Sequence, residues 1–254
     1  MRKILFVLLT SLTLFACKKD DTLMYGNMTM GNIDGETIIS DQGNTFDIVE
    51  GNSDLDLSKF EYGRVMIMCD VLTKTADKRY DIRLNGISSV LTKETVKASS
   101  ITDPESEMNV DNPINIREIW YSGGYINMLV ELARKNGSDT KHLINLIHDD
   151  SAVKEGEYTF ILRHNAFGET PTEENTNFVA SNGYVSFPVT SVIKEDSAKI
   201  IMKWKSHKMI NGGYSLTQSE DRTKEYDWKN MGYIHDRLVP TTPNLTLCRN
   251  FLAR

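Results

Sequence analysis

The chain has 254 residues, of which 40% are hydrophobic, 9% are aromatic and 25% are charged, and its formal net charge is −6. This hydrophobic content is sufficient for globular domains, which excludes a chain that is disordered over most of its length. The net negative charge, without a block of Lys or Arg, argues against nucleic acid or anionic lipid as the main partner.

The first predicted element is an export signal. Arg2 and Lys3 precede an apolar run from Ile4 to Ala16, which gives the positive start and short hydrophobic region of a secretory signal peptide. A membrane-spanning helix needs about 20 apolar residues, so the run is too short to be one. We therefore predict that residues 1–16 are removed, which changes the formal net charge from −6 to −8 because Arg2 and Lys3 are lost.

A cysteine follows this run directly, in the sequence Leu14-Phe15-Ala16-Cys17. The ending resembles the lipobox of bacterial lipoproteins, in which the cysteine is acylated and becomes the mature N-terminus. The resemblance implies that Cys17 carries acyl chains such as palmitate and that residues 17–26 form a lipidated tether. Such chains anchor a protein without a spanning helix, at about 0.8 kcal/mol per buried methylene. An ordinary signal peptide with a chance cysteine is the alternative.

The residues after Cys17 carry a second signal. Lys18, Lys19, Asp20 and Asp21 resemble the export signal by which lipoproteins of Bacteroidota reach the outer face of the outer membrane. The resemblance implies an outer membrane lipoprotein that is exposed at the cell surface. Because any solvated tether is polar, an anchor that faces the periplasm is the alternative.

Strand patterns dominate the next part of the chain. Residues 62–72 and 79–88 carry apolar or β-branched residues at alternate positions, and the polar residues 73–78 between them predict a hairpin. Upstream, residues 36–52 have the pattern of two short strands around a polar turn. Short strands at this spacing predict a small β-barrel over residues 27–100.

A polar segment then interrupts the strands. Residues 97–113 contain two prolines and show little periodicity, so residues 101–114 are predicted to be an acidic linker between two domains. The alternating acidic residues that begin at Asp103 resemble a calcium-binding loop, but Met108 stands where the EF-hand pattern has glycine. We therefore predict a solvated linker and no metal site.

Residues 115–254 are predicted to form a second domain. Within it, residues 116–132 have the pattern of a hairpin in which Gly123 and Gly124 supply the positive φ angles of a two-residue turn. Residues 220–228 have the pattern of a short helical turn, and a loosely ordered tail is expected after about residue 231. Four further strand patterns make a β-sandwich the predicted fold, and they cover residues 141–149, 156–168, 183–189 and 198–206.

Several segments are similar to the two domains of one family. FEYGRVMIMCDVL and RYDIRLNGISSVLTKE, within residues 60–94, are similar to the N-terminal domain of the NigD-like lipoproteins of Bacteroidota. IWYSGGYINMLVEL, HLINLIHD and FILRHNAFGE, within residues 119–169, resemble the C-terminal domain of the same family. The resemblance implies an all-β chain with an N-terminal OB-like small barrel followed by a C-terminal β-sandwich. It implies no catalytic residue, and the family is named for its association with bacteriocin operons.

Three aromatic residues flank the predicted glycine turn: Trp120, Tyr121 and Tyr125. Aromatic side chains beside a hairpin tip can stack on sugars or anchor a protein partner, which makes these three the candidate binding residues. They can equally be core and turn residues of the sandwich, and the sequence leaves both interpretations open.

Motifs for catalysis are absent from the sequence, which has no G-x-S-x-G, H-E-x-x-H, P-loop or C-x-x-C pattern. His164 has Arg163, Asn165 and Glu169 close to it in sequence. We interpret it as a strand-end residue that fixes a turn by hydrogen bonds, rather than as a catalytic or zinc-binding residue. The chain is therefore predicted to have no catalytic residue and no cofactor.

Two covalent modifications are considered from short patterns. Cys69 lies in an alternating apolar run and is interpreted as a small buried residue, with a disulfide to Cys248 as the alternative. Three tripeptides of aspartate, hydroxyl residue and apolar residue resemble O-glycosylation sites of Bacteroidota. This resemblance implies candidate sites at Thr22, Ser151 and Ser197.

The predicted function is that of a non-enzymatic cell-envelope lipoprotein with a binding role, as an immunity or accessory protein associated with a bacteriocin. Its expected partners are the membrane, through the N-terminal lipid, and a bacteriocin-like peptide, another protein or a glycan. An OB-like groove can also bind nucleic acid, but the acidic chain argues against that partner. The alternative is a surface carbohydrate-capture accessory protein or an unrecognised glycan hydrolase.

Overall fold

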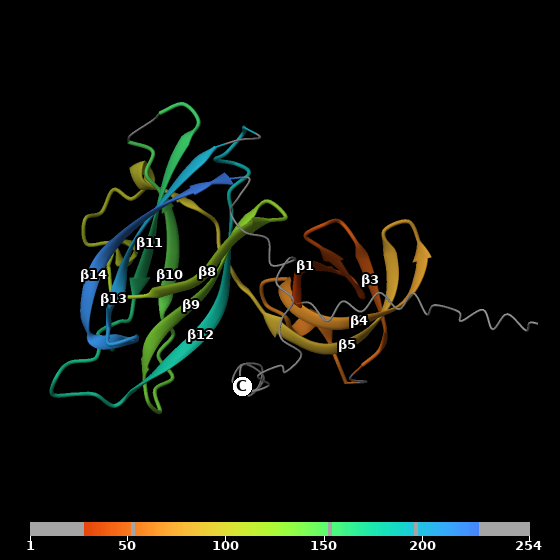
Figure 1. Cartoon of the computed structure of the whole chain (residues 1–254), viewed down its shortest axis with the longest axis horizontal. Coiled ribbons are helices and arrows are strands. Elements are labelled where there is room, and N and C mark those ends of the chain that lie inside the picture. Colours follow the sequence, from red (N-terminus) through yellow and green to blue (C-terminus); the bar gives the residue numbers. More distant parts are fainter. Residues whose placement is uncertain (1–27, 52–53, 152–153, 196–197, 229–254) are drawn as a thin grey trace, which may run out of the picture.

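The computed structural model describes residues 28–51, 54–151, 154–195 and 198–228. Within these ranges the chain forms a small β-barrel followed by a β-sandwich, and the two lie side by side (Figure 1). The predicted all-β fold class is thereby confirmed. No helix in the described part of the chain is long and apolar enough to cross a membrane.

Five strands form the closed barrel, in the order β1-β2-β3-β5-β4. The pair β3 and β5 is parallel, whereas the neighbouring pairs around the rest of the ring are antiparallel. The predicted hairpin and the predicted pair of short strands are both present in this barrel. The strands are β1 (Met28–Asp34), β2 (Thr37–Ser40), β3 (Thr45–Glu50), β4 (Arg64–Ala76) and β5 (Arg79–Ser89).

The barrel core follows from the alternation in β4. Val65, Ile67, Cys69 and Val71 point inward and are at most 2% exposed, because alternate residues of a strand face the same side. Burial raises the pKa of the Cys69 thiol to about 11, so this cysteine packs as a small apolar residue. Cys248 lies outside the described residues, so the alternative prediction of a disulfide between Cys69 and Cys248 also lies outside them.

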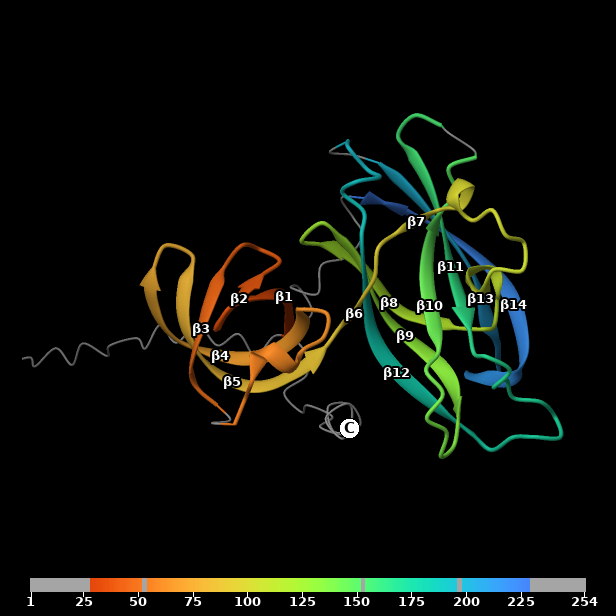
Figure 2. The same ribbon diagram turned by 180° about the vertical axis from the view of Figure 1, so that it is seen from behind.

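The second domain is built from two facing sheets (Figure 2). One has the strand order β14-β13-β11-β10-β7 and the other β6-β12-β9-β8. Side chains from both sheets form one apolar core, with Phe160, Phe187 and Met128 completely buried in it. The strands are β6 (Leu91–Thr92), β7 (Val96–Lys97), β8 (Asn115–Ser122), β9 (Tyr125–Lys135), β10 (Leu143–His148), β11 (Glu157–Asn165), β12 (Phe178–Pro188), β13 (Lys199–Ile210) and β14 (Gly213–Asp227).

The helical turn predicted at residues 220–228 is wrong, because most of that segment belongs to β14. This strand lies at the edge of its sheet and pairs with β13 along most of its length, from Lys199 opposite Asp227 to Ile210 opposite Gly213. Its charged side chains face solvent on an edge strand, where they discourage pairing with other chains. The charged residues of this segment therefore gave no strand pattern in the sequence, although the segment is a strand.

The passage between the domains differs from the predicted boundaries. β6 and β7 lie inside the range predicted for the barrel, 27–100, but they pair with the sandwich strands β12 and β10. The segment predicted as a linker, 101–114, runs along the sandwich instead of between the domains. Its end is fixed there because Ile114 is buried and its backbone N–H donates to the carbonyl oxygen of Lys205. An apolar residue and backbone hydrogen bonds thus outweigh the polar composition of this segment.

Candidate functional site

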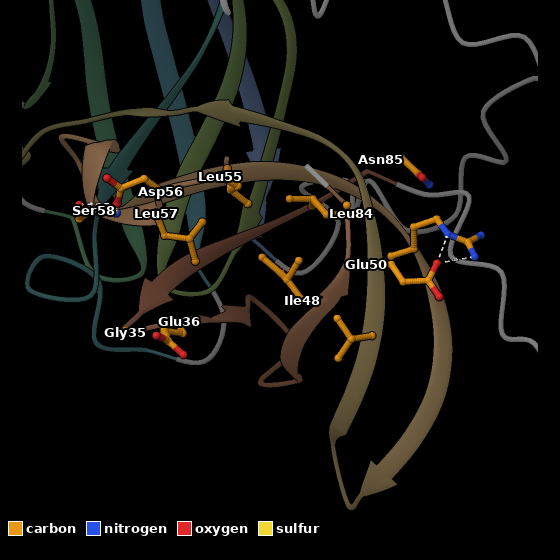
Figure 3. Close-up of a pocket in the computed structure, with 13 residues that line it drawn as sticks. Gly35, Glu36, Ile48, Glu50, Leu55, Asp56, Leu57, Ser58, Leu84 and Asn85 are labelled. Carbon is orange, nitrogen blue, oxygen red and sulfur yellow. Dashed lines mark hydrogen bonds and ion pairs between the residues drawn. The ribbon is translucent and has the colours of Figure 1, made fainter. Parts of the chain in front are cut away.

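A broad groove opens on the barrel and has a volume of about 1070 Å³. Its walls come from four separate segments: the β1–β2 turn with Glu36, the end of β3, the loop with the short 3-10 helix η1 (Leu57–Lys59), and the middle of β5. Figure 3 shows Ile48, Leu55, Leu57 and Leu84 gathered at the centre of this groove. The barrel thus presents a preformed aliphatic surface to solvent.

The aliphatic surface of the groove is continuous with the barrel core. Leu84 is a core residue that is 8% exposed, and the half-buried Ile48 and Leu55 pack against the same cluster. Next to Ile48, the pairing of β3 with β5 shifts register between Ile48 and Glu50. Such a bulge leaves the extra residue outside the regular ladder. The residue concerned is Val49, whose side chain is 55% exposed at the groove.

Acidic side chains surround this aliphatic centre. Glu36, Glu50 and Asp56 line the groove together with a single basic residue, Arg83. The Arg83 guanidinium is already paired, at 2.6 Å from Glu50 and 3.7 Å from Asp70. Hydrogen bonds from the Ser58 side chain and backbone lower the pKa of Asp56, so this carboxylate stays ionised at neutral pH. The groove therefore carries a net negative charge.

A second feature is the buried contact between the barrel and the tip of the β8–β9 hairpin, which points at the barrel (Figures 1 and 2). Arg64 of β4 is 1% exposed and makes two parallel 2.8 Å hydrogen bonds to the carboxylate of Asp41, which follows β2. From the sandwich, Asn127 accepts a 2.9 Å hydrogen bond from Arg64 and Ser186 accepts one of 3.1 Å. Ser122 donates to Asp41.

The three candidate aromatic residues lie at or behind this contact. Trp120 is 3% exposed and packs with barrel residues that include Met30. The Tyr125 ring lies over the Arg64 guanidinium, with 4.0 Å between the carbon of the guanidinium and the ring centre. Tyr121 stacks on Trp228 with 3.7 Å between ring centres. All three rings are engaged within the molecule, which fits the interpretation that they are core and turn residues.

The histidine singled out in the sequence lies in a buried hydrogen-bond chain. His164 is 2% exposed, and its Nδ1 lies 3.0 Å from the carbonyl oxygen of Pro113. A carbonyl oxygen only accepts, so this nitrogen carries the hydrogen, and Nε2 of His164 accepts from His142 Nδ1 at 2.9 Å. Glu169 lies 3.8 Å beyond, at His142 Nε2. The two histidines are buried and hold the segment before β8. His164 therefore has a structural role near the end of β11, although it fixes this segment and not a turn.

The neighbours of His164 have similar structural roles. Arg163 pairs with Asp111 at 2.6 Å, and Asn165 accepts a 2.8 Å hydrogen bond from the backbone of Phe167. Among the described residues, no group of three or more His, Cys, Asp or Glu side chains is placed to hold a metal ion.

The sandwich matches a known domain family. The sequence profile described as "NigD-like C-terminal beta sandwich domain" matches residues 97–217. These residues, which make up most of the sandwich, are therefore similar to that domain family. The resemblance seen in the sequence is thereby confirmed for the C-terminal domain. The matched residues include the β8–β9 hairpin, whose tip contacts the barrel. No curated protein sequence matches the chain.

Solved structures share the fold of both domains. An immunity protein described as NigD-like, from Bacteroides caccae, has a TM-score of 0.54 at 17% identity, covering 79% of this chain and 95% of its own. A candidate lipoprotein from Bacteroides fragilis has a TM-score of 0.55 at 13% identity, with coverage of 79% and 97%. A protein of unknown function from Bacteroides vulgatus has a TM-score of 0.57 at 18% identity, with coverage of 87% and 97%. Neither the family nor these names indicate an enzyme.

Several predicted site residues lie outside the described residues. These are the lipidation site Cys17, the export-signal residues Lys18, Lys19, Asp20 and Asp21, and the candidate glycosylation sites Thr22 and Ser197. Ser151 is described, and it is exposed in the turn after β10, where its hydroxyl donates a 2.6 Å hydrogen bond to Asp149.

Gly123 in the hairpin of the NigD-like domain is constrained twice. Its φ of 60° lies in the left-handed region, and a Cβ placed on it would come within 2.4 Å of the Asp41 carboxylate. We predict that Gly123→Ala loses more stability than Gly137→Ala, measured by urea denaturation. Gly137 has a similar φ of 77° with no atom within 4 Å of an added Cβ, so it reports the backbone cost alone, about 1–2 kcal/mol. Equal losses would contradict a close approach of Asp41.

Proposed function

We propose that this protein is a non-enzymatic lipoprotein of the cell envelope that binds a peptide or protein partner through the groove of its barrel. The observation that carries this proposal is the partly exposed aliphatic centre of the groove, a preformed concave surface. Val49, at 55% exposed, belongs to this surface. Burial of an exposed aliphatic side chain by a partner lowers the free energy of the complex.

The composition of the groove argues for the class of partner. Its acidic lining disfavours nucleic acid, because carboxylates repel phosphates. None of the residues that the structure places along the groove is aromatic, whereas single-stranded nucleic acids stack on aromatic rings and a sugar would use the same faces. The aromatic residues on which a glycan-binding or glycan-cleaving role would depend are engaged at the domain contact and in the sandwich. We therefore favour a polypeptide over a glycan.

The proposed location rests on the N-terminal sequence. Cys17 after a short apolar run supports lipidation, and Lys18 to Asp21 supports export to the cell surface. The likeness in fold to a Bacteroides caccae protein named as an immunity protein supports a role in immunity or as an accessory to a bacteriocin. In this role the anchored protein binds the bacteriocin at the outer membrane and keeps it from acting on that membrane.

The test is affinity capture from native outer membranes with the lipidated full-length protein as bait. We expect wild type to retain a specific polypeptide that Val49→Asp loses, because a charge would stand in the aliphatic surface. Val179→Asp is the matched control, since Val179 of β12 is 49% exposed and lies away from the groove. Equal capture by wild type and Val49→Asp would refute a role for the groove.

Membrane anchoring is tested separately with Cys17→Ala. We predict that wild type fractionates with the outer membrane and is cleaved by protease added to intact cells, whereas Cys17→Ala is found in the soluble fraction. A Cys17→Ala protein that stays with the outer membrane would contradict lipidation as the anchor. Cleavage of wild type only after the cells are broken would place the anchored protein on the periplasmic side.

A further inference from the structure

We propose that the occupant of the barrel groove is an extended peptide segment in which cationic side chains alternate with aliphatic ones. This inference rests on the proposed binding function and names the chemistry of the partner. Three properties of the groove carry it: the sign of its charge, the position of that charge around an aliphatic centre, and the bulged strand at its edge.

The charge of the groove is complementary to a cation. Three carboxylates, those of Glu36, Glu50 and Asp56, line the groove against one guanidinium. That guanidinium, of Arg83, is compensated by Glu50 and by Asp70. Asp56 is paired with the exposed Lys59 at 3.5 Å, just outside the lining. The carboxylate of Glu36 makes no hydrogen bond or ion pair with the described residues and is exposed in the turn between β1 and β2. A lysine or arginine of a partner therefore meets attraction here, and an anionic segment meets repulsion.

The carboxylates are distributed around the aliphatic side chains. In Figure 3, Asp56 and Glu50 lie on opposite sides of the central group formed by Ile48, Leu57 and its neighbours. A ligand that fills the centre with one aliphatic side chain would place the adjacent residues of its chain toward the carboxylates. An extended chain places alternate side chains on the same side, so aliphatic residues can face the centre. The long basic side chains between them can bend back to the carboxylates at the rim.

The size of the groove and the bulge at Val49 favour a peptide over a compact ligand. A volume of about 1070 Å³ is slightly above the range for sites that enclose a single small molecule, about 300–1,000 Å³. Bulges that re-aim a side chain are common next to binding sites, and this one directs Val49 to the groove edge. An extended segment of several residues fits such an open surface, with Val49 beside its aliphatic positions.

The test uses the purified lipidated protein in a non-ionic detergent and three fluorescent octapeptides, (Leu-Lys)4, (Leu-Glu)4 and (Ser-Lys)4, followed by fluorescence anisotropy. We expect saturable binding of (Leu-Lys)4 alone, weakened by added salt because the ion pairs are exposed. Glu36→Lys should weaken that binding about 3- to 10-fold, from the reversal of one exposed ion pair. Val49→Asp should weaken (Leu-Lys)4 binding as well.

Two variants control for charge and surface. Glu173→Lys makes the same charge change on an exposed loop of the sandwich, and Val179→Asp makes the same apolar-to-acidic change on β12. Both should bind (Leu-Lys)4 as wild type does. Equal binding of (Leu-Glu)4 or (Ser-Lys)4, or no effect of Glu36→Lys and Val49→Asp, would overturn the inference. If native capture depends on Val49 while (Leu-Lys)4 does not bind, the proposed function stands and only this inference fails.

Discussion

Replacing Arg64 with alanine is expected to destabilise the protein by about 3–5 kcal/mol, because it leaves the Asp41 carboxylate buried without its partner. The side chains of this pair are 1% and 2% exposed, so water cannot replace the lost hydrogen bonds. The same change also removes the two hydrogen bonds that Arg64 of the barrel donates to Asn127 and Ser186 of the sandwich. The loss should therefore appear both in the free energy of unfolding, measured in urea, and in the attachment of the two domains, measured by limited proteolysis.

Arg79→Ala is the matched control for this prediction. Arg79 also makes two parallel hydrogen bonds to one carboxylate, each 2.7 Å long, but its side chain is 51% exposed and that of its partner Asp47 is 23% exposed. An exposed pair is expected to contribute at most about 1 kcal/mol. Both arginines make two hydrogen bonds to one carboxylate, Arg64 through Nη1 and Nη2 and Arg79 through Nε and Nη2. The contrast between them therefore reports burial together with the further hydrogen bonds of Arg64 to the sandwich. A loss below about 1 kcal/mol for Arg64→Ala would mean that the pair is solvated and that the domain contact opens in solution.

A second comparison separates the net contribution of the Arg64–Asp41 pair to stability from the cost of leaving one partner buried alone. Replacing both Arg64 and Asp41 with apolar residues, Met and Leu, removes the uncompensated charge. The double variant is therefore expected to be more stable than Arg64→Ala. The loss of stability that remains in the double variant measures the cost of leaving Ser122, Asn127 and Ser186 of the sandwich without their hydrogen-bond partners in the barrel.

The strands could be predicted from the sequence because their signals are local. The alternation around Ile82 and Leu84 and the pair Gly123 and Gly124 determine, respectively, which face of β5 is buried and where β8 turns into β9. Each of these signals depends only on neighbouring residues. The same locality explains the failure at residues 220–228, where an edge strand with both faces largely polar has no alternation to detect.

The domain contact was missed, although a signal for it is present. In β4 the residues Val65, Met66 and Ile67 are buried in succession, whereas a barrel strand with one face in water alternates. A continuous apolar run indicates burial on both faces. The second face is buried because Met66 belongs to the same apolar cluster as Trp120 of the sandwich. Arg64 begins this run, and its burial follows from the same contact.

The groove has no comparable signal in the sequence. Its walls combine a turn near Glu36, the bulged end of β3, a loop around Leu55 and the middle of β5. Residues so far apart in the chain come together only through closure of the barrel, and no local pattern marks which exposed carboxylates will share one surface. A site of this kind is found from the fold and not from a motif.

Acidification from pH 7 to pH 5 is expected to destabilise the protein by about 2 kcal/mol through His164 alone. Burial, reinforced by the neighbouring His142, lowers the pKa of His164 from 6.5 to about 4. The folded state thus holds this ring neutral, while the unfolded chain binds a proton below about pH 6.5. Because the unfolded state takes up more protons, stability is complete above pH 6.5, falls as the pH drops toward 4, and changes no further below that value through this residue.

Other titrating groups act in the same direction or at lower pH. Burial also lowers the pKa values of His142 and His207, which adds to the loss in the same window. Hydrogen bonds from Ser138 and Thr140 lower the pKa of Glu169, so its contribution is lost only at pH values nearer to 4 and below. The interval from pH 7 to pH 5 therefore reports mainly the buried histidines.

His164→Gln tests this assignment by removing the titrating ring. The variant is expected to be less stable at pH 7, because it loses the packing of the imidazole ring and its hydrogen bonds to Pro113 and His142. Its stability should change less than that of wild type between pH 7 and pH 5. His148→Gln is the control, since His148 is half-buried at the other end of β10 and should leave most of the loss in place. Urea denaturation across the pH range gives the free energies, and NMR titration of the ring protons gives the pKa of His164 directly. A His164 pKa near 6.5, or an equal loss of stability in wild type and His164→Gln, would mean that water reaches this ring and that the segment before β8 opens from the sandwich.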